Sequence, residues 1–106
     1  MKATLKLEDG SDKTVAENNA RADTLMRKLR RFAVEHRKTE LDWNDIDNYK
    51  YYIYCDRNEV RLDIDYTNVY PHFYGVYFDT EETAKAAIEE FKEELIWYFT
   101  EYKDSL

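Results

Sequence analysis

Cysteine, proline and glycine are scarce in this chain, which has one cysteine, one proline and two glycines in 106 residues. A single cysteine cannot form an internal disulfide or a thiolate metal cage, which suits a reducing compartment. Two glycines cannot build a glycine-rich phosphate loop. The scarcity of glycine and proline also argues against a flexible linker. No stretch is apolar enough for a signal sequence or a bilayer span. We therefore expect one intracellular domain over residues 1–106.

Residue patterns typical of enzymes and metal sites are also missing. The two histidines, His36 and His72, have no cysteine or carboxylate at ligand spacing. A calcium loop counted from Asp42 would need Gly and Glu at its sixth and twelfth positions, where this chain has Asp and Ile. The sequence thus predicts a protein with no catalytic residues, no metal and no cofactor.

Charge is abundant but unevenly divided. Residues 40–106 contain 17 acidic and 6 basic residues, a net charge of −11, whereas residues 21–38 contain 7 basic and 2 acidic ones, a net charge of +5. The acidic part repels nucleic acid, yet its carboxylates can imitate phosphates toward a protein whose groove is lined with Arg and Lys. Either internal charge matching or two faces for different partners would explain the division.

Two amphipathic helices are predicted, over residues 15–39 and 80–103. In the first, apolar residues recur every three or four positions from Ala22 to His36. The second is introduced by Asp79 or Thr80 as a cap, and its apolar stripe leaves Trp97 on nearly the opposite, exposed side. We expect residues 1–14 to be a tail or to contain an additional strand at residues 3–7.

A period of two predicts three strands within residues 49–79. The alternating apolar positions are Tyr49, Tyr51, Ile53 and Cys55, then Val60, Leu62, Ile64 and Tyr66, then His72, Tyr74, Val76 and Phe78. A tight turn at residues 56–59, with Asn58 tolerant of positive φ, joins the first two. We expect an α+β domain in which a helix precedes, and another follows, a three-stranded antiparallel sheet.

Two surfaces are candidates for binding. The first is acidic and aromatic, and would use carboxylates as phosphate mimics and aromatic rings as anchors: Asp42, Asp45, Asp47, Asp63, Asp65, Tyr52, Tyr54 and Trp97. The second is the basic helix, which would contact nucleic acid through Arg27, Lys28, Arg30 and Arg31. Repulsion from the acidic remainder argues against nucleic acid as the partner. Helices covering both sheet faces, or a homodimer formed through Trp97, remain alternatives.

Three segments carry a resemblance to a known group of proteins: Leu41-Asp42-Trp43-Asn44-Asp45, Lys50-Tyr51-Tyr52-Ile53-Tyr54-Cys55-Asp56, and Val76 to Ile88. Over roughly residues 25–98 the chain resembles the C-terminal module of small acidic accessory proteins of phages and prophages of Gram-positive bacteria. Those proteins commonly have a Gly-Glu or Gly-Asp pair after the first turns of the last helix, where this chain continues with Glu89 to Glu93.

The resemblance implies a function class and a location, although it transfers no particular residues. Small, acidic, glycine-poor phage proteins include inhibitors of host defence nucleases, among them anti-CRISPR proteins. It implies a non-catalytic inhibitor in the cytoplasm of a bacterial host, bound to the basic groove of a nuclease such as a CRISPR effector, without membrane contact. The alternatives are a phage accessory factor that binds nucleic acid through the basic helix, or a homo-oligomeric structural module.

Overall fold

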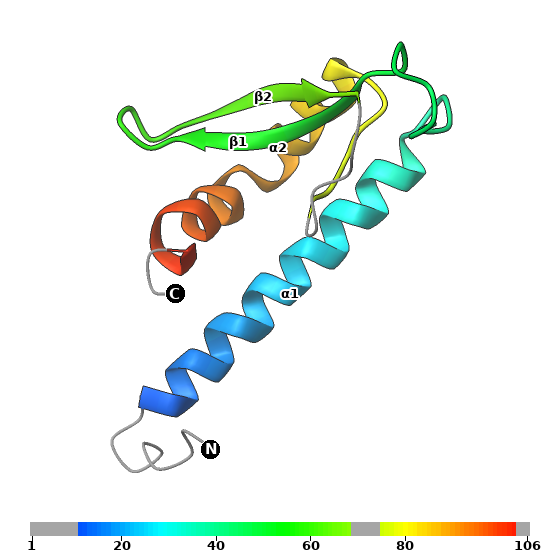
Figure 1. The fold of residues 1–106 in the computed structure, drawn as a ribbon. Helices are drawn as coiled ribbons and strands as arrows, with labels where there is room; N and C mark the ends of the chain where they lie inside the picture. The colour runs from blue at the N-terminus through cyan, green and yellow to red at the C-terminus, as the bar shows by residue number, and fades with distance from the viewer. Residues whose placement is uncertain (1–10, 69–74, 104–106) are drawn as a thin grey trace.

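The computed structural model of the protein describes residues 11–68 and 75–103, and their architecture is α+β. The elements are α1 (Ser11–Glu35), β1 (Lys50–Asp56), β2 (Arg61–Thr67), α2 (Glu81–Trp97) and a π-helical turn, η2 (Tyr98–Tyr102). β1 and β2 form an antiparallel hairpin. Helix α2 packs against one face of this hairpin and also against α1, so it lies at the centre of the fold (Figure 1).

The prediction of a three-stranded sheet is wrong, because the described residues form a sheet of two strands. Where a third strand was expected, Phe78 alone bridges to Tyr51, with N···O distances of 2.9 and 2.8 Å. The next residue, Asp79, accepts hydrogen bonds from the end of α1, which draws the chain away from β1 after one bridge. The expected strand positions His72 and Tyr74, like the tail strand at residues 3–7, lie outside the described residues.

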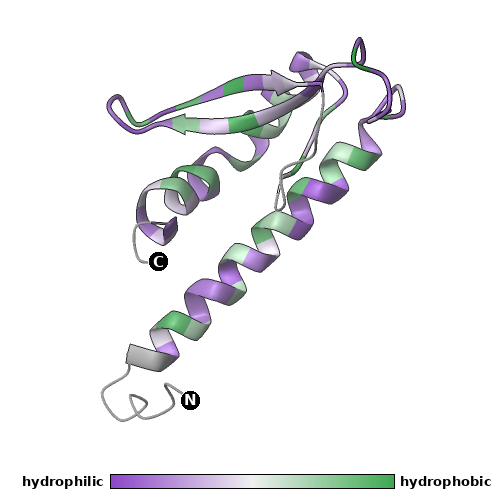
Figure 2. Ribbon diagram, viewed as in Figure 1, coloured by the Kyte–Doolittle hydropathy of each residue, from purple (hydrophilic) through white to green (hydrophobic). Residues whose placement is uncertain are grey.

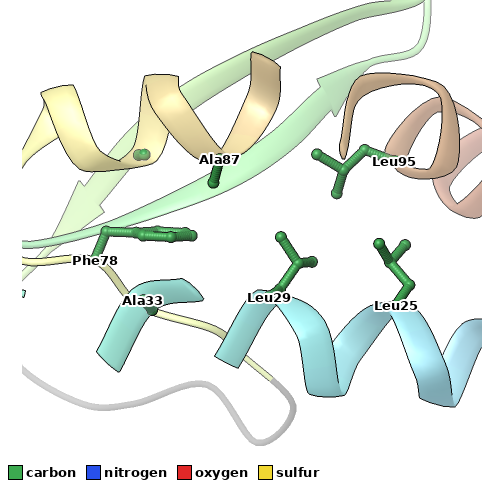
Figure 3. Close-up of a cluster of buried hydrophobic side chains, with 7 residues drawn as sticks. Leu25, Leu29, Ala33, Phe78, Ala87 and Leu95 are labelled. Carbon is green, nitrogen blue, oxygen red and sulfur yellow. The ribbon is translucent and has the colours of Figure 1, made fainter. Parts of the chain in front are cut away.

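Helix α1 has the amphipathic pattern that the sequence predicts, although it spans Ser11–Glu35 rather than residues 15–39. Apolar and polar residues alternate along it in Figure 2. Its buried residues, Ala22, Leu25, Leu29 and Ala33, recur every three or four positions and form one stripe. Figure 3 shows Leu25, Leu29 and Ala33 of this stripe facing Phe78, Ala87 and Leu95, and all six belong to the hydrophobic core.

The segment that joins the hairpin to α2 also ties the two helices together. Thr80 is the N-cap of α2, and its hydroxyl accepts a hydrogen bond from the Thr83 N–H at 3.1 Å. The Asp79 carboxylate accepts from the N–H groups of Lys38 at 2.7 Å and Thr39 at 3.1 Å, just beyond α1. Burial disfavours its charge, but these bonds, with Thr83, outweigh burial and lower the pKa of Asp79.

The hairpin turn contains a residue with a left-handed backbone. The turn spans residues 57–60, and the positive φ lies at Val60, at 51°, rather than at Asn58 as expected. Asn58 instead donates its N–H to the Asp56 carboxylate at 3.0 Å. A β-branched residue in this conformation is strained, because its Cβ approaches the following carbonyl. Val60 is also 51% exposed at the tip, so packing does not explain its presence there.

Candidate functional site

Two tyrosines lie directly opposite two aspartates on the hairpin. The strand register pairs Tyr52 with Asp65 and Tyr54 with Asp63. These residues share one face, because partners in a register project to the same side and neighbours along a strand project to opposite sides. Ile53 and Ile64 project to the other face and pack against the core. We call the set Tyr52, Tyr54, Asp63 and Asp65 the tyrosine-aspartate face.

A row of aromatic rings connects this face to the loop that precedes β1. The rings of Trp43 and Tyr77 meet edge to face with centroids 4.9 Å apart, and the Tyr77 and Tyr52 centroids are 6.2 Å apart. Lys50, with 0% exposure, fixes the loop beneath them. Its Nζ lies 3.1 Å from the carbonyl of Asp45 and 4.9 Å from the centre of the Trp43 ring. The acidic loop and the hairpin therefore form one connected surface.

Asp63 and Asp65 also have a structural role at the outer edge of β2. Because Tyr51 directs its N–H and C=O toward Phe78, the alternation of the ladder directs the N–H groups of Ile64 and Tyr66 away from β1. The Asp63 carboxylate accepts from Ile64 N–H at 2.9 Å, and the Asp65 carboxylate accepts from Tyr66 N–H at 2.8 Å. The aspartates thus satisfy an open sheet edge, a common defence against strand pairing between molecules.

The loop aspartates play a similar local part. Asp42 accepts from the N–H of Asn44, and Asp45 accepts from the N–H of Asp47, both at 2.9 Å, as in Asx turns. All three loop aspartates are exposed. The carboxylates of Asp42 and Asp45 are therefore held in place by backbone bonds while they face solvent, which is the rigidity that a phosphate mimic requires.

The tyrosine hydroxyls on this face remain protonated at neutral pH. Burial first, and then the negative charge of Asp65, raises the pKa of Tyr52, which also has a side-chain hydrogen bond to that carboxylate. Burial and the charge of Asp63 likewise raise the pKa of Tyr54. Tyr54 is 37% exposed, so part of its ring is open to a partner. The face thus combines aromatic rings and hydroxyl donors with two carboxylates.

The prediction that Trp97 is exposed is wrong. Trp97 is 8% exposed, and the guanidinium of Arg21 on α1 lies 3.9 Å from the centre of its ring. Two hydrogen bonds to Glu94, at 2.9 and 2.6 Å, hold Arg21 in that position. Tyr102 covers another part, with ring centroids 5.4 Å apart. Helical phase could not reveal the side chain of another helix above Trp97, and the non-helical backbone of Phe91 (φ −119°, ψ 22°) interrupts the phase of α2 before Trp97.

The basic residues of α1 are gathered on its uncovered side. Arg27, Lys28, Arg30 and Arg31 are all exposed. At 100° per residue they span an arc of about 160°, centred opposite the buried stripe. Among the described residues, none of the four takes part in an ion pair within 4 Å. They form an exposed basic surface on α1, opposite its buried stripe.

Three residues at this surface, Trp43, Tyr77 and Lys50, were not among the predicted site residues. The strand register could have indicated that Tyr77 and Lys50 belong to this surface. If Phe78 lies opposite Tyr51, then Tyr77 lies beside Tyr52, on the same face as the aspartates. Lys50 is the first residue of β1, and alternation places it on the same face as Tyr52 and Tyr54. Its burial, however, depends on Trp43, which belongs to an irregular loop. Local patterns do not predict such a contact.

Within residues 11–68 and 75–103, no group of three or more His, Cys, Asp or Glu side chains is placed to hold a metal ion. In the same part of the chain, no helix combines the length and the apolar character needed to cross a membrane. Comparisons of the chain with protein-family models, with curated proteins and with solved structures find no match.

Proposed function

We propose that this protein is a non-catalytic binding module whose tyrosine-aspartate face occupies an arginine-rich, nucleic-acid-binding groove of another protein. The observation that carries the proposal is the strand register, which sets Tyr52 against Asp65 and Tyr54 against Asp63 on one face of the hairpin, while Ile53 and Ile64 pack against the core on the other. An arginine can stack on a tyrosine ring and pair with the neighbouring carboxylate at the same time. Two such pairs side by side offer positions for two arginines.

The geometry of the carboxylates supports mimicry of a nucleic acid. Each aspartate on the face uses its Oδ1 to accept a backbone bond, which fixes the direction of the carboxylate. The Oδ2 of Asp63 lies 3.6 Å from Nη2 of Arg61, in an exposed ion pair that an arginine of the partner would replace. Asp42, Asp45 and Asp47 extend the negative charge onto the loop that the Trp43 ring joins to the hairpin. A row of fixed negative charges resembles a phosphate backbone to a groove that binds by electrostatic attraction.

The resemblance to phage accessory proteins suggests which class of partner to test first. A host defence nuclease, such as a CRISPR effector, has the required basic groove, and occupation of that groove would inhibit it. In this proposal the protein is an inhibitor in the anti-CRISPR sense, acting without catalysis. The proposal depends on the charge and geometry of the face, and the resemblance only orders the candidates.

A charge-neutral variant tests the face without disturbing the sheet edge. Asp63→Asn with Asp65→Asn keeps an oxygen acceptor for each edge N–H but removes both charges. Glu89→Gln with Glu90→Gln removes the same charge from exposed positions of α2 and is the matched control. Proteins captured from a nuclease-treated bacterial lysate by the wild-type chain are identified, and their affinity for each variant is measured at physiological salt.

The proposal predicts a captured nucleic-acid-binding protein from which duplex nucleic acid displaces the chain. The Asn variant should bind it about a hundredfold or more weakly, since it loses two charge pairs and close interfacial charge pairs contribute about 1.5 kcal/mol or more each, whereas the Gln control should bind nearly as wild type. Equal loss in both variants would mean that net charge alone decides binding, and unchanged binding in both would remove the face from the interface.

A second candidate function is direct binding of nucleic acid by α1, and the exposed basic surface favours it. The arc of four unpaired basic residues has the width and exposure of a phosphate-binding surface. The net charge of −7 opposes it. Fluorescence anisotropy with a labelled duplex distinguishes the two functions. Direct nucleic-acid binding by α1 predicts salt-dependent binding of the duplex, which the double variant Arg27→Gln, Arg31→Gln abolishes. The groove-binding function predicts no binding of the duplex.

A further inference from the structure

A cavity of about 500 Å³ lies beside β1, on the side where Phe78 pairs with it. Helix α1 contributes Met26 and Leu29 to its wall, and the segment before α2 contributes Val76. The C-terminal part of the chain closes it with Phe99. The volume lies within the range of about 300–1,000 Å³ that is usual for small-molecule sites, and the lining is mainly apolar and aromatic, as in such sites.

Among the described residues that line the cavity, Lys103 is the only one that is charged at neutral pH. Its Nζ lies 5.9 Å from the ring centres of Tyr98 and Phe99, which also line the cavity. Lys103 is exposed, so its ammonium marks a boundary between the apolar space and solvent. A cation at the edge of an apolar cavity complements a ligand that has an apolar body and one negative end.

The π-helical turn places Lys103 in this position. In an α-helix, Lys103 would lie about 140° around the axis from Tyr98. In η2 the N–H of Lys103 donates to the carbonyl of Tyr98, five residues earlier, so the two residues lie more nearly above one another. Single π turns within helices occur frequently at functional sites, because they redirect side chains that the α-helical repeat would separate.

Tyr98 provides a second polar group beside Lys103. Burial, and then Tyr102, raises the pKa of Tyr98, with Arg30 acting in the opposite direction. Its hydroxyl is therefore protonated at neutral pH and is able to donate a hydrogen bond to a carboxylate oxygen. The described lining thus includes one ammonium, that of Lys103, and the side chains of four tyrosines: Tyr52, Tyr54, Tyr77 and Tyr98.

From the cavity, its lining and the position of Lys103, we infer that the protein binds a small amphipathic carboxylate. The apolar body of the ligand fills the space between α1 and β1, and its carboxylate lies against Lys103 and Tyr98. Tyr52 and Tyr54 also line the cavity, so it adjoins the tyrosine-aspartate face, but the ligand's carboxylate lies at Lys103, whereas the proposed function depends on Asp63 and Asp65. Ligand binding there would brace α1, β1 and the C-terminal turn against one another.

Decanoate, held below its micelle concentration, is the probe, with decan-1-ol as its uncharged equivalent, and calorimetry measures both affinities. Lys103→Gln should weaken decanoate about threefold to tenfold, a modest effect because the ammonium is exposed, and should leave decan-1-ol unchanged. The matched control Lys92→Gln, at an exposed position of α2, should change neither. Met26→Trp fills the cavity and should weaken both ligands at least tenfold.

Three results would overturn the inference: no decanoate binding at millimolar concentration, equal binding by the wild type and Lys103→Gln, or equal loss in both lysine variants. The Lys103→Gln result tests the inference even if Met26→Trp does not fold, because Lys103 is exposed and its replacement should leave the fold intact. The Asp63→Asn, Asp65→Asn variant should bind decanoate like the wild type. Failure of the cavity site is therefore distinguishable from failure of the proposed function.

Discussion

Replacement of Asp79 should destabilise the protein more than replacement of any exposed aspartate, because its carboxylate joins the end of α1 to the start of α2. It accepts two backbone hydrogen bonds, from Lys38 at 2.7 Å and Thr39 at 3.1 Å. Bonds to a charged acceptor contribute about 1.5–3 kcal/mol each. Both donors belong to exposed residues, so water can replace the carboxylate, and the lower value applies. Asp79→Ala should therefore lower the free energy of unfolding by about 3 kcal/mol.

The same bonds predict a dependence on pH. Because they lower the pKa of Asp79 in the folded state, its stabilisation is complete above the pKa of about 3.9 of an unfolded aspartate, and disappears as the pH falls through the folded value. Asp79→Asn keeps an acceptor but cannot titrate. Its stability should therefore fall less steeply than that of the wild type between about pH 5 and pH 2.

Urea unfolding followed by circular dichroism at several pH values tests both statements. The matched control is Asp47→Ala, at an exposed position whose carboxylate has no hydrogen bond among the described residues, and it should stay within about 0.5 kcal/mol of wild type. Equal unfolding free energies for Asp79→Ala and Asp47→Ala would refute the reasoning. The reasoning would also be refuted if the free energy of unfolding fell equally steeply with decreasing pH in the wild type and in Asp79→Asn.

Two further predictions concern backbone geometry. Val60→Gly should raise the midpoint of urea unfolding, by about 1 kcal/mol of stability, because glycine adopts the φ of 51° without strain; a lower midpoint would show that the turn is not strained. Gly75→Ala should cost about 1–3 kcal/mol, since its Cβ would lie 2.5 Å from the Tyr77 ring, which Trp43 holds in place. An unchanged midpoint in that variant would mean that the ring moves freely.

Local patterns predicted the elements that depend on residues close in sequence. The spacing of Leu25, Leu29 and Ala33 sufficed for α1, and Thr80 followed by acidic residues marked the start of α2. Alternation identified β1 and β2, but the turn expected at residues 56–59 lies at residues 57–60, so the expected turn would have paired Cys55 with Val60, whereas Cys55 pairs with Leu62.

The errors came from contacts between residues far apart in sequence. The third strand was predicted because alternation continues to Phe78, but Asp79 binds the end of α1, about forty residues earlier, and the chain turns away. Trp97 was predicted to be exposed because the phase of α2 says nothing of Arg21, whose guanidinium covers it. The buried state of Lys50 likewise depends on Trp43 in an irregular loop. Such contacts need the assembled fold.

Nuclear magnetic resonance titration of the ¹⁵N-labelled chain with a short arginine-rich peptide, and separately with a DNA duplex, tests the central claim most directly. The account predicts that the peptide shifts the amide signals of residues 52–54 and 63–65 at physiological salt, that Asp63→Asn with Asp65→Asn abolishes these shifts, and that the duplex causes none. Shifts confined to α1 in the presence of the duplex, or peptide shifts that the Asn variant retains, would contradict it.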